Sequence, residues 1–288
     1  MNASQSVESP GALNNPAQFE ADLERRFGAL RRLYGRVGYA RLRSATVAVV
    51  GLGGVGSWAA EALARSGVAA LVLIDLDHVA ESNINRQVQA LGVTVGQSKV
   101  QALRDRIQDI HPGCVVHGVE EFVDADNWPA LLTSPVDAII DACDQVRAKS
   151  ALAAWALHMN VPAVCVGAAG GKRAPQQVEV ADLSDVTHDP LLAALRQRLR
   201  KDGVAARGDR PAPQRSAAKL GLRCVFSREP VRPPVQDSEL IAVQDVPSTV
   251  PPASAEGNLS CHGYGSSVTV TATFGMVAAS EAIALLLA

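Results

Sequence analysis

The feature that most constrains the fold is a continuous apolar run that ends in a glycine cluster. Residues 46–50 read Thr-Val-Ala-Val-Val, and they lead into Gly51-Leu-Gly-Gly-Val-Gly56. Such a run is typical of a strand that is buried on both faces of a parallel sheet. The glycines Gly51, Gly53 and Gly56 match GxGxxG, in which the backbone approaches a phosphate at a helix N-terminus. We therefore predict a nucleotide site at this turn.

Strand-like and helix-like segments alternate after this turn. Further strands are predicted at 70–74, 115–119, 136–140 and 161–166, and helices at 58–66, 99–110 and 148–158. This alternation indicates a parallel sheet with helices on both faces. The pattern then changes to a strand at 177–180 and a helix at 189–201, with Asp189 as its cap. We expect an α/β fold, a Rossmann-like doubly wound, mainly parallel sheet with an antiparallel C-terminal extension.

The length of 288 residues suits one large domain. Residues 1–21 are polar, with Pro and Asn, and predict a disordered tail; residues 22–288 form the domain. A helix is predicted at 22–37, with Leu23, Phe27, Leu30 and Leu33 or Tyr34 on one face. We expect a nucleotide-binding half at 44–171 and a substrate-facing half at 172–288. The latter holds a mobile loop at 203–220 and an irregular, proline-rich segment at 230–252.

The cysteines and the apolar C-terminus indicate where in the cell the protein is expected to be. The cysteines are odd in number and form no CxxC pair, so we expect no zinc site and a reducing cytoplasm. Residues 268–288 are long and apolar enough to span a membrane, but threonines and Glu281 interrupt them. The favoured interpretation is a strand or turn followed by a buried helix, and the alternative is membrane association. Cys143 is interpreted as a small buried residue rather than a nucleophile. Cys224 and Cys261 are interpreted as buried or simply exposed residues, with a redox or sulfur-transfer role as the alternative.

A net charge of −2 conceals two basic stretches. Residues 191–232 hold eleven Lys or Arg and three acids, and residues 25–43 hold seven Arg and no acid. Clustered cations attract phosphates, so the longer stretch, centred on 196–232, is a candidate contact for a nucleic acid. The alternative is a solvated helix face and a solvated loop.

The residues after the second strand favour ATP over other nucleotides. Asp75 ends the strand, where it would accept hydrogen bonds from a ribose hydroxyl. Arg86 and Lys99 follow, and they would neutralise the charge that builds up on a departing pyrophosphate. Asp144 follows another strand and would hold the Mg²⁺ that bridges the phosphates, unless it only caps the next helix. A dehydrogenase or regulator that binds NAD remains an alternative, although it needs neither Arg86 nor Lys99.

These motifs together resemble a known family. GxGGxG, DxDxVxxSNxNRQ, a lysine and a DACD turn resemble the ubiquitin-activating-enzyme-like (ThiF-like) adenylating enzymes. The resemblance implies that Gly54 contacts the nucleotide, that the segment with Ser82, Asn83, Asn85 and Arg86 lines the phosphate site, and that Lys99 binds phosphate. It also implies an arginine of the N-terminal arm, Arg26 or Arg32, that enters the partner's site in a homodimer.

Other segments narrow the resemblance to the tRNA threonylcarbamoyladenosine dehydratases. They are Arg26-Phe-Gly28, Arg32-Leu-Tyr-Gly35, 53–63, Asp189-Pro-Leu191 and Thr271-Ala-Thr-Phe-Gly275. The resemblance implies ATP-dependent cyclisation, with loss of water, of a modified adenosine beside the anticodon of ANN-decoding tRNA. It also implies an association with a cysteine desulfurase or sulfur-acceptor system. Adenylation of the C-terminus of a ubiquitin-like sulfur-carrier protein remains the alternative reaction.

Overall fold

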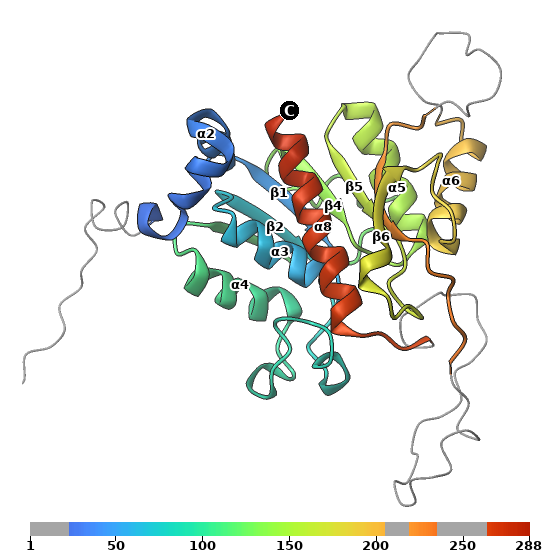
Figure 1. The fold of residues 1–288 in the computed structure, drawn as a ribbon, viewed down its shortest axis with the longest axis horizontal. Helices are drawn as coiled ribbons and strands as arrows, with labels where there is room; N and C mark the ends of the chain where they lie inside the picture. The colour runs from blue at the N-terminus through green and yellow to red at the C-terminus, as the bar shows by residue number, and fades with distance from the viewer. Residues whose placement is uncertain (1–22, 205–218, 235–263) are drawn as a thin grey trace, which may run out of the picture.

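A computed structural model describes residues 23–204, 219–234 and 264–288. They build a seven-stranded sheet in the order β3-β2-β1-β4-β5-β7-β6 (Figure 1). Every neighbouring pair is parallel except β6 and β7, which are antiparallel. The strands are β1 (Thr46–Val50), β2 (Ala70–Ile74), β3 (Val115–Val119), β4 (Ala138–Asp141), β5 (Ala163–Val166), β6 (Val178–Asp182) and β7 (Arg223–Ser227). The predicted doubly wound sheet is confirmed.

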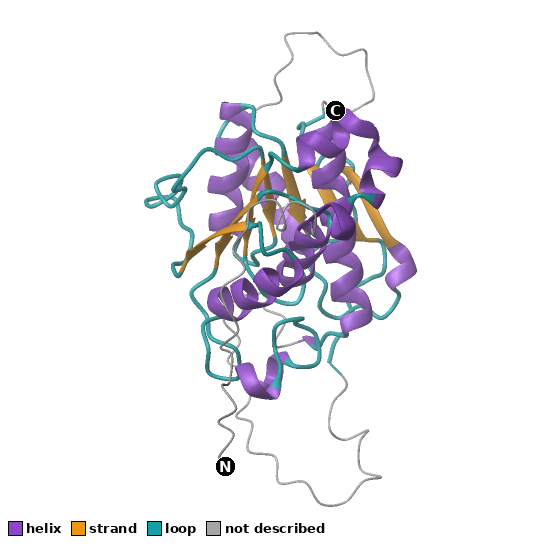
Figure 2. Cartoon of the chain, turned by 90° about the vertical axis from the view of Figure 1, so that its left-hand side faces the viewer, coloured by secondary structure: helices purple, strands orange, loops and turns teal. Residues whose placement is uncertain are grey.

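Helices cover both faces of the sheet (Figure 2). They are α2 (Ala29–Leu42), α3 (Gly56–Arg65), α4 (Lys99–Ile110), α5 (Val146–Met159), α6 (Pro190–Lys201) and α8 (Val268–Leu287), with short 3₁₀ turns η1 (Glu81–Asn83), η2 (Gly92–Thr94) and η3 (Pro175–Gln177). The predicted cap of α6 is confirmed, since the Asp189 carboxylate accepts a hydrogen bond from the Leu192 N–H.

Alternate residues of each central strand enter different cores. Val47 and Val49 of β1 pack with α3, α4 and α8, whereas Ala48 and Val50 pack with α5. A third cluster joins α6 to β5 and β7. Because both faces are covered at β1, β2, β4 and β5, these strands have no polar face, which explains their apolar runs.

Helix α8 is one continuous helix that packs across one face of the sheet. It begins at Val268, directly after the Ser267 cap, so the predicted strand or turn at its start is wrong. It is long and apolar enough to cross a membrane, and half of its most apolar window is buried inside the protein. The buried positions include Phe274, Ala278 and Ala282, which belong to the main core. Packing on the sheet therefore accounts for its apolar sequence.

Strand β7 is the main element that the sequence did not predict. It lies between β5 and β6, inside the basic stretch, and only Arg223 of its five residues is exposed. The arginines and prolines around it obscure a short apolar run. Leu220, at the end of the predicted mobile loop, is buried and donates its N–H to Asp182 Oδ1 at 2.9 Å. Residues 205–218 of that loop, the predicted tail and Cys261 lie outside the described residues.

The N-terminal helix differs from its predicted form. A helical turn at 23–27 breaks at Gly28, and α2 continues to Leu42, beyond the predicted end at Val37. Gly35 has a φ of 72°, so the helical face shifts there. Leu33 is consequently 70% exposed rather than buried, while Leu23 and Phe27 pack with Tyr39.

Candidate active site

One pocket lies at the carboxyl ends of the parallel strands. It opens beside β1 and β4, where the chain order reverses within the sheet, and such a switch point is where open α/β sheets bind ligands. The cavity measures about 190 Å³. Seven of the predicted site residues line it: Gly51, Gly53, Gly54, Asp75, Arg86, Lys99 and Asp144.

The glycines of the turn have different physical reasons to be glycine. Gly51 has a φ of 84°, and a Cβ at Gly56 would lie 1.8 Å from the Gly51 carbonyl oxygen. These two glycines therefore allow the turn itself, and Gly56 does not line the cavity. A Cβ at Gly53 would meet nothing within 4 Å, so this glycine leaves open space for a ligand. Helix α3 begins at Gly56, next to this space.

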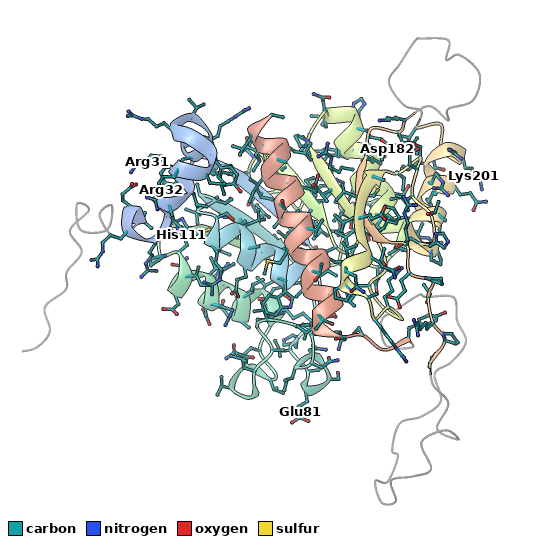
Figure 3. All side chains as sticks on the ribbon, viewed as in Figure 1. Arg31, Arg32, Glu81, His111, Asp182 and Lys201 are labelled. Carbon is teal, nitrogen blue, oxygen red and sulfur yellow. The ribbon has the colours of Figure 1, made fainter. Side chains whose placement is uncertain are left out.

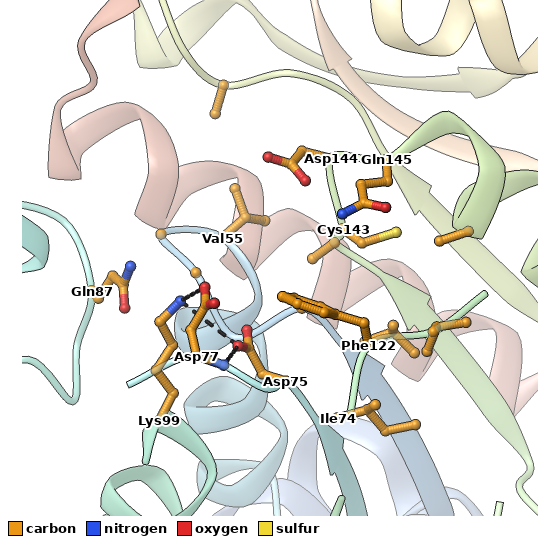
Figure 4. Close-up of a pocket in the computed structure, with 18 of the residues that line it drawn as sticks. Val55, Ile74, Asp75, Asp77, Gln87, Lys99, Phe122, Cys143, Asp144 and Gln145 are labelled. Carbon is orange, nitrogen blue, oxygen red and sulfur yellow. Dashed lines mark hydrogen bonds and ion pairs between the residues drawn. The ribbon is translucent and has the colours of Figure 1, made fainter. Parts of the chain in front are cut away.

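A charged cluster occupies one side of the pocket (Figure 4). Asp75 accepts hydrogen bonds from the backbone N–H groups of Leu52 (2.6 Å) and Asp77 (2.9 Å). The Lys99 ammonium lies 2.6 Å from Asp77 Oδ2 and 3.7 Å from Asp75 Oδ1. Burial raises the pKa of Asp75, although the charge of Lys99 opposes this shift. Lys99 thus sits at the pocket wall with an anionic partner that is half-exposed.

Arg86 is held by the segment that precedes it. Its Nη1 donates to the Ser82 carbonyl oxygen at 2.6 Å and to Asn85 Oδ1 at 2.9 Å. Asn83 is buried, and its side chain accepts a hydrogen bond from the Ala80 N–H. Of the predicted segment only Arg86, with Gln87 after it, lines the cavity. Ser82, Asn83 and Asn85 therefore position Arg86 rather than face the pocket.

Asp144 lies across the pocket from Lys99 (Figure 4). Its carboxylate forms no hydrogen bond or ion pair with the described residues. Magnesium in nucleotide sites usually takes one or two carboxylates together with phosphate oxygens and water. An exposed, unpaired carboxylate on the wall of this cavity fits that role, and no cluster of three metal-ligating side chains occurs in the described part of the chain.

A buried ion pair between Lys149 and Asp141 lies near Asp144, and the sequence did not predict it. Lys149 is fully buried, and its Nζ lies 3.2 Å from Asp141 Oδ1. Burial alone would lower the pKa of Lys149, but the Asp141 carboxylate raises it above its usual range. The Cys143 thiol also donates to Asp141 Oδ1, at 2.8 Å. Burial and this carboxylate raise the pKa of Cys143, which keeps it a neutral thiol and not a nucleophile.

The remaining wall of the pocket is apolar. Val50, Ile74, Phe122, Val123 and Ala148 line it. Phe122 lines the same pocket as the charged cluster and Asp144 (Figure 4). One cavity thus joins an apolar wall with two cations and a free carboxylate, which is what a nucleobase and a magnesium-bound phosphate chain need.

The two candidate arginines of the N-terminal arm have different surroundings. Arg26 Nη1 donates to the carbonyl oxygens of Asp109 and Ile110, both at 2.8 Å, at the end of α4. Arg32 is exposed, and it lies far from Glu81, which directly precedes the Ser82–Arg86 segment (Figure 3). Neither arginine lines the pocket of its own chain.

The basic stretch is only partly free to bind a ligand. Arg196 donates hydrogen bonds to the carbonyl oxygens of Leu183 and Val186. Four further arginines each form an ion pair with a carboxylate: Arg198, Arg223, Arg228 and Arg232. Arg200 and Lys201 are exposed at the end of α6 (Lys201 in Figure 3). Helix α6 begins beside the pocket, where Leu191 lines it, and a 12-residue helix extends about 18 Å. Cys224 is fully buried, as expected.

Comparisons with known proteins agree with this geometry. A model of the ThiF family matches residues 26–288. The tRNA threonylcarbamoyladenosine dehydratase of Escherichia coli (strain K12) is 42% identical over 267 residues, which cover 91% of this chain and 94% of that protein. A crystal structure of the E. coli tRNA N6-threonylcarbamoyladenosine dehydratase in complex with ATP is 40% identical, covers 91% of this chain and 94% of that chain, and has a TM-score of 0.76. The molybdopterin-synthase adenylyltransferase of E. coli (strain K12) is 37% identical over 127 residues, 44% of this chain and 51% of that protein.

Proposed function

Because the chain belongs to the ThiF family, we propose that it uses ATP to cyclise N6-threonylcarbamoyladenosine in tRNA with loss of water. The observation that carries this proposal is the single cavity in which the glycine-rich turn meets Lys99, Arg86 and the free Asp144 carboxylate. The match over 91% of the chain to the dehydratase, against 44% to the molybdopterin-synthase enzyme, favours a tRNA nucleoside over a sulfur-carrier protein as the acceptor.

The lining of the pocket supports one orientation of ATP in this proposal. Its adenine would lie on the apolar wall at Phe122, and its ribose would bond to Asp75, whose carboxylate is already oriented by two backbone N–H groups. Its phosphates would follow the open side of Gly53 toward the N-terminus of α3, where helix N–H groups favour an anion. Lys99 would exchange its partner Asp77 for a phosphate oxygen.

The chemistry has two steps. A carboxylate oxygen of the threonine attacks the α-phosphorus, and pyrophosphate leaves; an atom of the same nucleoside then attacks the acyl carbon, and AMP leaves. The nucleoside loses one water overall. Lys99 and Arg86 stabilise the charge on the departing pyrophosphate. Asp144 would hold Mg²⁺, which when bound neutralises phosphate charge. No thioester is required, because the second nucleophile belongs to the substrate.

The catalytic unit is a homodimer in this proposal. Arg32 is exposed and has no role in its own pocket, so it is the better candidate for an arginine that acts on the partner's phosphates, whereas Arg26 already binds the end of α4. Exposed cations such as Arg200 and Lys201 would hold tRNA phosphates at the end of α6, about 18 Å from the start of that helix at the pocket. We place the enzyme in the cytoplasm with its tRNA, with α8 in the core rather than in a membrane. An association with a sulfur-acceptor system stays a prediction.

The test is an assay on tRNA that carries threonylcarbamoyladenosine, with the digested nucleosides analysed by mass spectrometry. Wild-type protein with ATP and Mg²⁺ should remove one water from that nucleoside. Arg86→Ala, Lys99→Ala and Asp144→Ala should each lower the rate about 100-fold or more, because each removes charge at the reacting phosphates. Their far-ultraviolet circular dichroism should stay that of the wild type.

Arg65→Ala provides the matched control, because Arg65 is half-exposed and does not line the pocket. It should keep wild-type activity. Full activity in all three pocket variants would contradict the site assignment. Pyrophosphate exchange that needs a sulfur-carrier protein, with no change in the tRNA nucleoside, would replace the proposed acceptor by that protein.

A further inference from the structure

Thr271 is a polar residue of the pocket to which the reaction above gives no role. It belongs to Thr271-Ala-Thr-Phe-Gly275, the first turns of α8, and it lines the cavity. The residue is 1% exposed, yet its Oγ1 has no hydrogen-bond partner within the described protein. A buried hydroxyl without a partner costs about 1–3 kcal/mol, so such a group calls for a reason.

The neighbours of Thr271 are parts of the predicted phosphate site. A Cβ built at Gly54 would lie 3.2 Å from both Cβ and Cγ2 of Thr271, and 3.3 Å from Cγ of Arg86. Thr271 is therefore packed against the glycine-rich turn on one side and lies beside the Arg86 stem. This position places a neutral hydroxyl among the groups expected to surround the phosphates.

The Thr271 hydroxyl forms no hydrogen bond to the backbone of α8, whereas the hydroxyl of Thr273 on the same helix does. Thr273 Oγ1 donates to the Thr269 carbonyl oxygen at 2.7 Å, the usual bond of a helical threonine. The carbonyl oxygen four residues before Thr271 belongs to Ser267, and it already accepts the backbone N–H groups of Val270 and Thr271. Threonine populates two rotamers in helices, and the Thr271 hydroxyl has no bond within the described protein that fixes it away from a ligand.

The close approach of α8 to the turn is itself specified by the sequence. A Cβ at Gly275 would lie 2.5 Å from the Val55 carbonyl oxygen and 2.8 Å from Trp58 Cβ. Phe274 is fully buried in the main core. Gly275 and Phe274 thus fix α8 against the start of α3, and Thr271, one turn earlier, is held at Gly54.

We propose that Thr271 is a further nucleotide-binding residue, whose hydroxyl donates a hydrogen bond to a phosphate oxygen of bound ATP beside Gly54. The inference rests on the proposed function, because it needs ATP in this pocket. An anionic oxygen is the acceptor that best compensates a buried, unused donor. The unsatisfied hydroxyl of the free protein then becomes satisfied only in the complex.

The test compares three variants of the full-length protein in two measurements. Thr271→Val keeps the shape and removes the hydroxyl, Thr271→Ser keeps the hydroxyl, and Thr273→Val removes a hydroxyl on the same helix outside the pocket. ATP affinity is measured by calorimetry with Mg²⁺ and without tRNA. Thr271→Val should weaken ATP binding about 10- to 100-fold, because it loses a hydrogen bond to a charged group. Thr271→Ser should stay within about three-fold of the wild type.

The second measurement is the melting temperature of the ligand-free protein. Thr271→Val should melt at the wild-type temperature or above it, since an isosteric apolar group replaces an unsatisfied hydroxyl. Thr273→Val should leave ATP affinity unchanged. This combination separates ligand binding from packing, because a residue that only packs would lose stability together with affinity.

Different outcomes reject different statements. If wild-type protein binds ATP and Thr271→Val binds it equally well, the inference fails and the proposed function stands. A higher KM for tRNA in Thr271→Val with unchanged ATP affinity would also overturn it, since the hydroxyl would then serve the carboxylate substrate. If the wild type does not bind ATP, the proposed function itself fails.

Discussion

At the scale of residues, one ion pair lies in the wall of the pocket and a second lies buried behind it, and the two have different roles. Lys99 pairs with Asp77, whose side chain is 54% exposed, so a phosphate can replace that partner at little cost. Lys149 and Asp141 are both fully removed from water, and neither lines the pocket. Because separation of a buried pair leaves an uncompensated charge, this second pair is permanent. It fixes the turn that presents Asp144.

We predict that Lys149→Met destabilises the protein by about 3–5 kcal/mol, because Asp141 is left buried and charged without a partner. Urea denaturation followed by circular dichroism measures the change. The double variant Asp141→Asn/Lys149→Met should recover part of the loss, because it removes the charge together with its partner.

Arg198→Ala is the control for this prediction. Arg198 and Asp202 form an exposed pair at 3.5 Å, and exposed pairs contribute about 0–1 kcal/mol. A loss below about 1 kcal/mol in Lys149→Met would mean that the buried pair does not hold the turn.

Site residues that belong to a local sequence motif could be predicted. Residues whose role depends on contacts between segments far apart in the sequence could not. Gly53, Lys99 and Asp144 stand in recognisable spacings, and the structure brings them to one cavity. Lys149 follows Asp141 by eight residues in an alanine-rich helix, where a lysine normally faces solvent. Thr271 lies far along the chain from Gly54, and no local pattern indicates their contact.

At the scale of elements, the sequence predicted the parallel strands because both faces of the sheet are covered. An apolar run followed by a charged residue, as at β2 and Asp75, is unambiguous when nothing solvated interrupts it. β7 escaped prediction because the cations around it belong to its exposed neighbours. Helix α8 was predicted, but its first turn contains threonines, which also suit a strand.

Helices α3 and α4 are joined by a carboxylate that titrates in the folded protein. Glu61 of α3 is buried, and it binds Arg106 of α4 as well as Arg65 at 2.8 Å. Burial alone would raise the pKa of Glu61, but its hydrogen bonds to Arg106 and Arg65 outweigh it and lower that pKa below the ordinary value of 4.5. The folded state therefore favours the charged form.

We predict that Glu61→Gln lowers the free energy of unfolding at neutral pH by about 1–3 kcal/mol, the size of a charge-assisted hydrogen bond. A depressed carboxyl pKa stabilises the protein above the unfolded pKa, and this contribution disappears as the pH falls through the folded pKa. The gap between variant and wild type should thus close below about pH 4.5. Urea denaturation from pH 7 to pH 3 measures it.

Glu179→Gln is the control, because Glu179 and Arg228 form an exposed pair. It should change stability by less than about 1 kcal/mol at every pH. A gap for Glu61→Gln that widens in acid would show that this carboxyl does not have a lowered pKa.

At the scale of the whole molecule, one chain does not bring Arg32 to its own pocket. If Arg32 acts on a partner's phosphates, Arg32→Ala and Arg86→Ala damage different halves of each shared site. We predict that each variant alone is nearly inactive, and that their coexpressed heterodimer regains activity. A random mixture should recover about a quarter of the wild-type rate, because half of the dimers keep one intact site. If each variant carries its own affinity tag, purification on both tags in turn isolates the heterodimer for the assay.

Arg26→Ala distinguishes the other candidate. Arg26 binds the last carbonyls of α4, so Arg26→Ala should lower the melting temperature, while the folded variant should keep activity without a partner variant. No recovery in the Arg32→Ala/Arg86→Ala heterodimer would place the action of Arg32 within its own chain or remove it from catalysis.

The place of α8 in the core also concerns how the protein is made. This helix covers β1, β4 and α3, yet the ribosome synthesises it long after them. A nascent chain that has finished the glycine-rich half still lacks one wall of its main core. Contacts of such long sequence separation slow folding and leave apolar surface exposed. The core around β1 and the glycine-rich turn is therefore complete only after translation has reached α8.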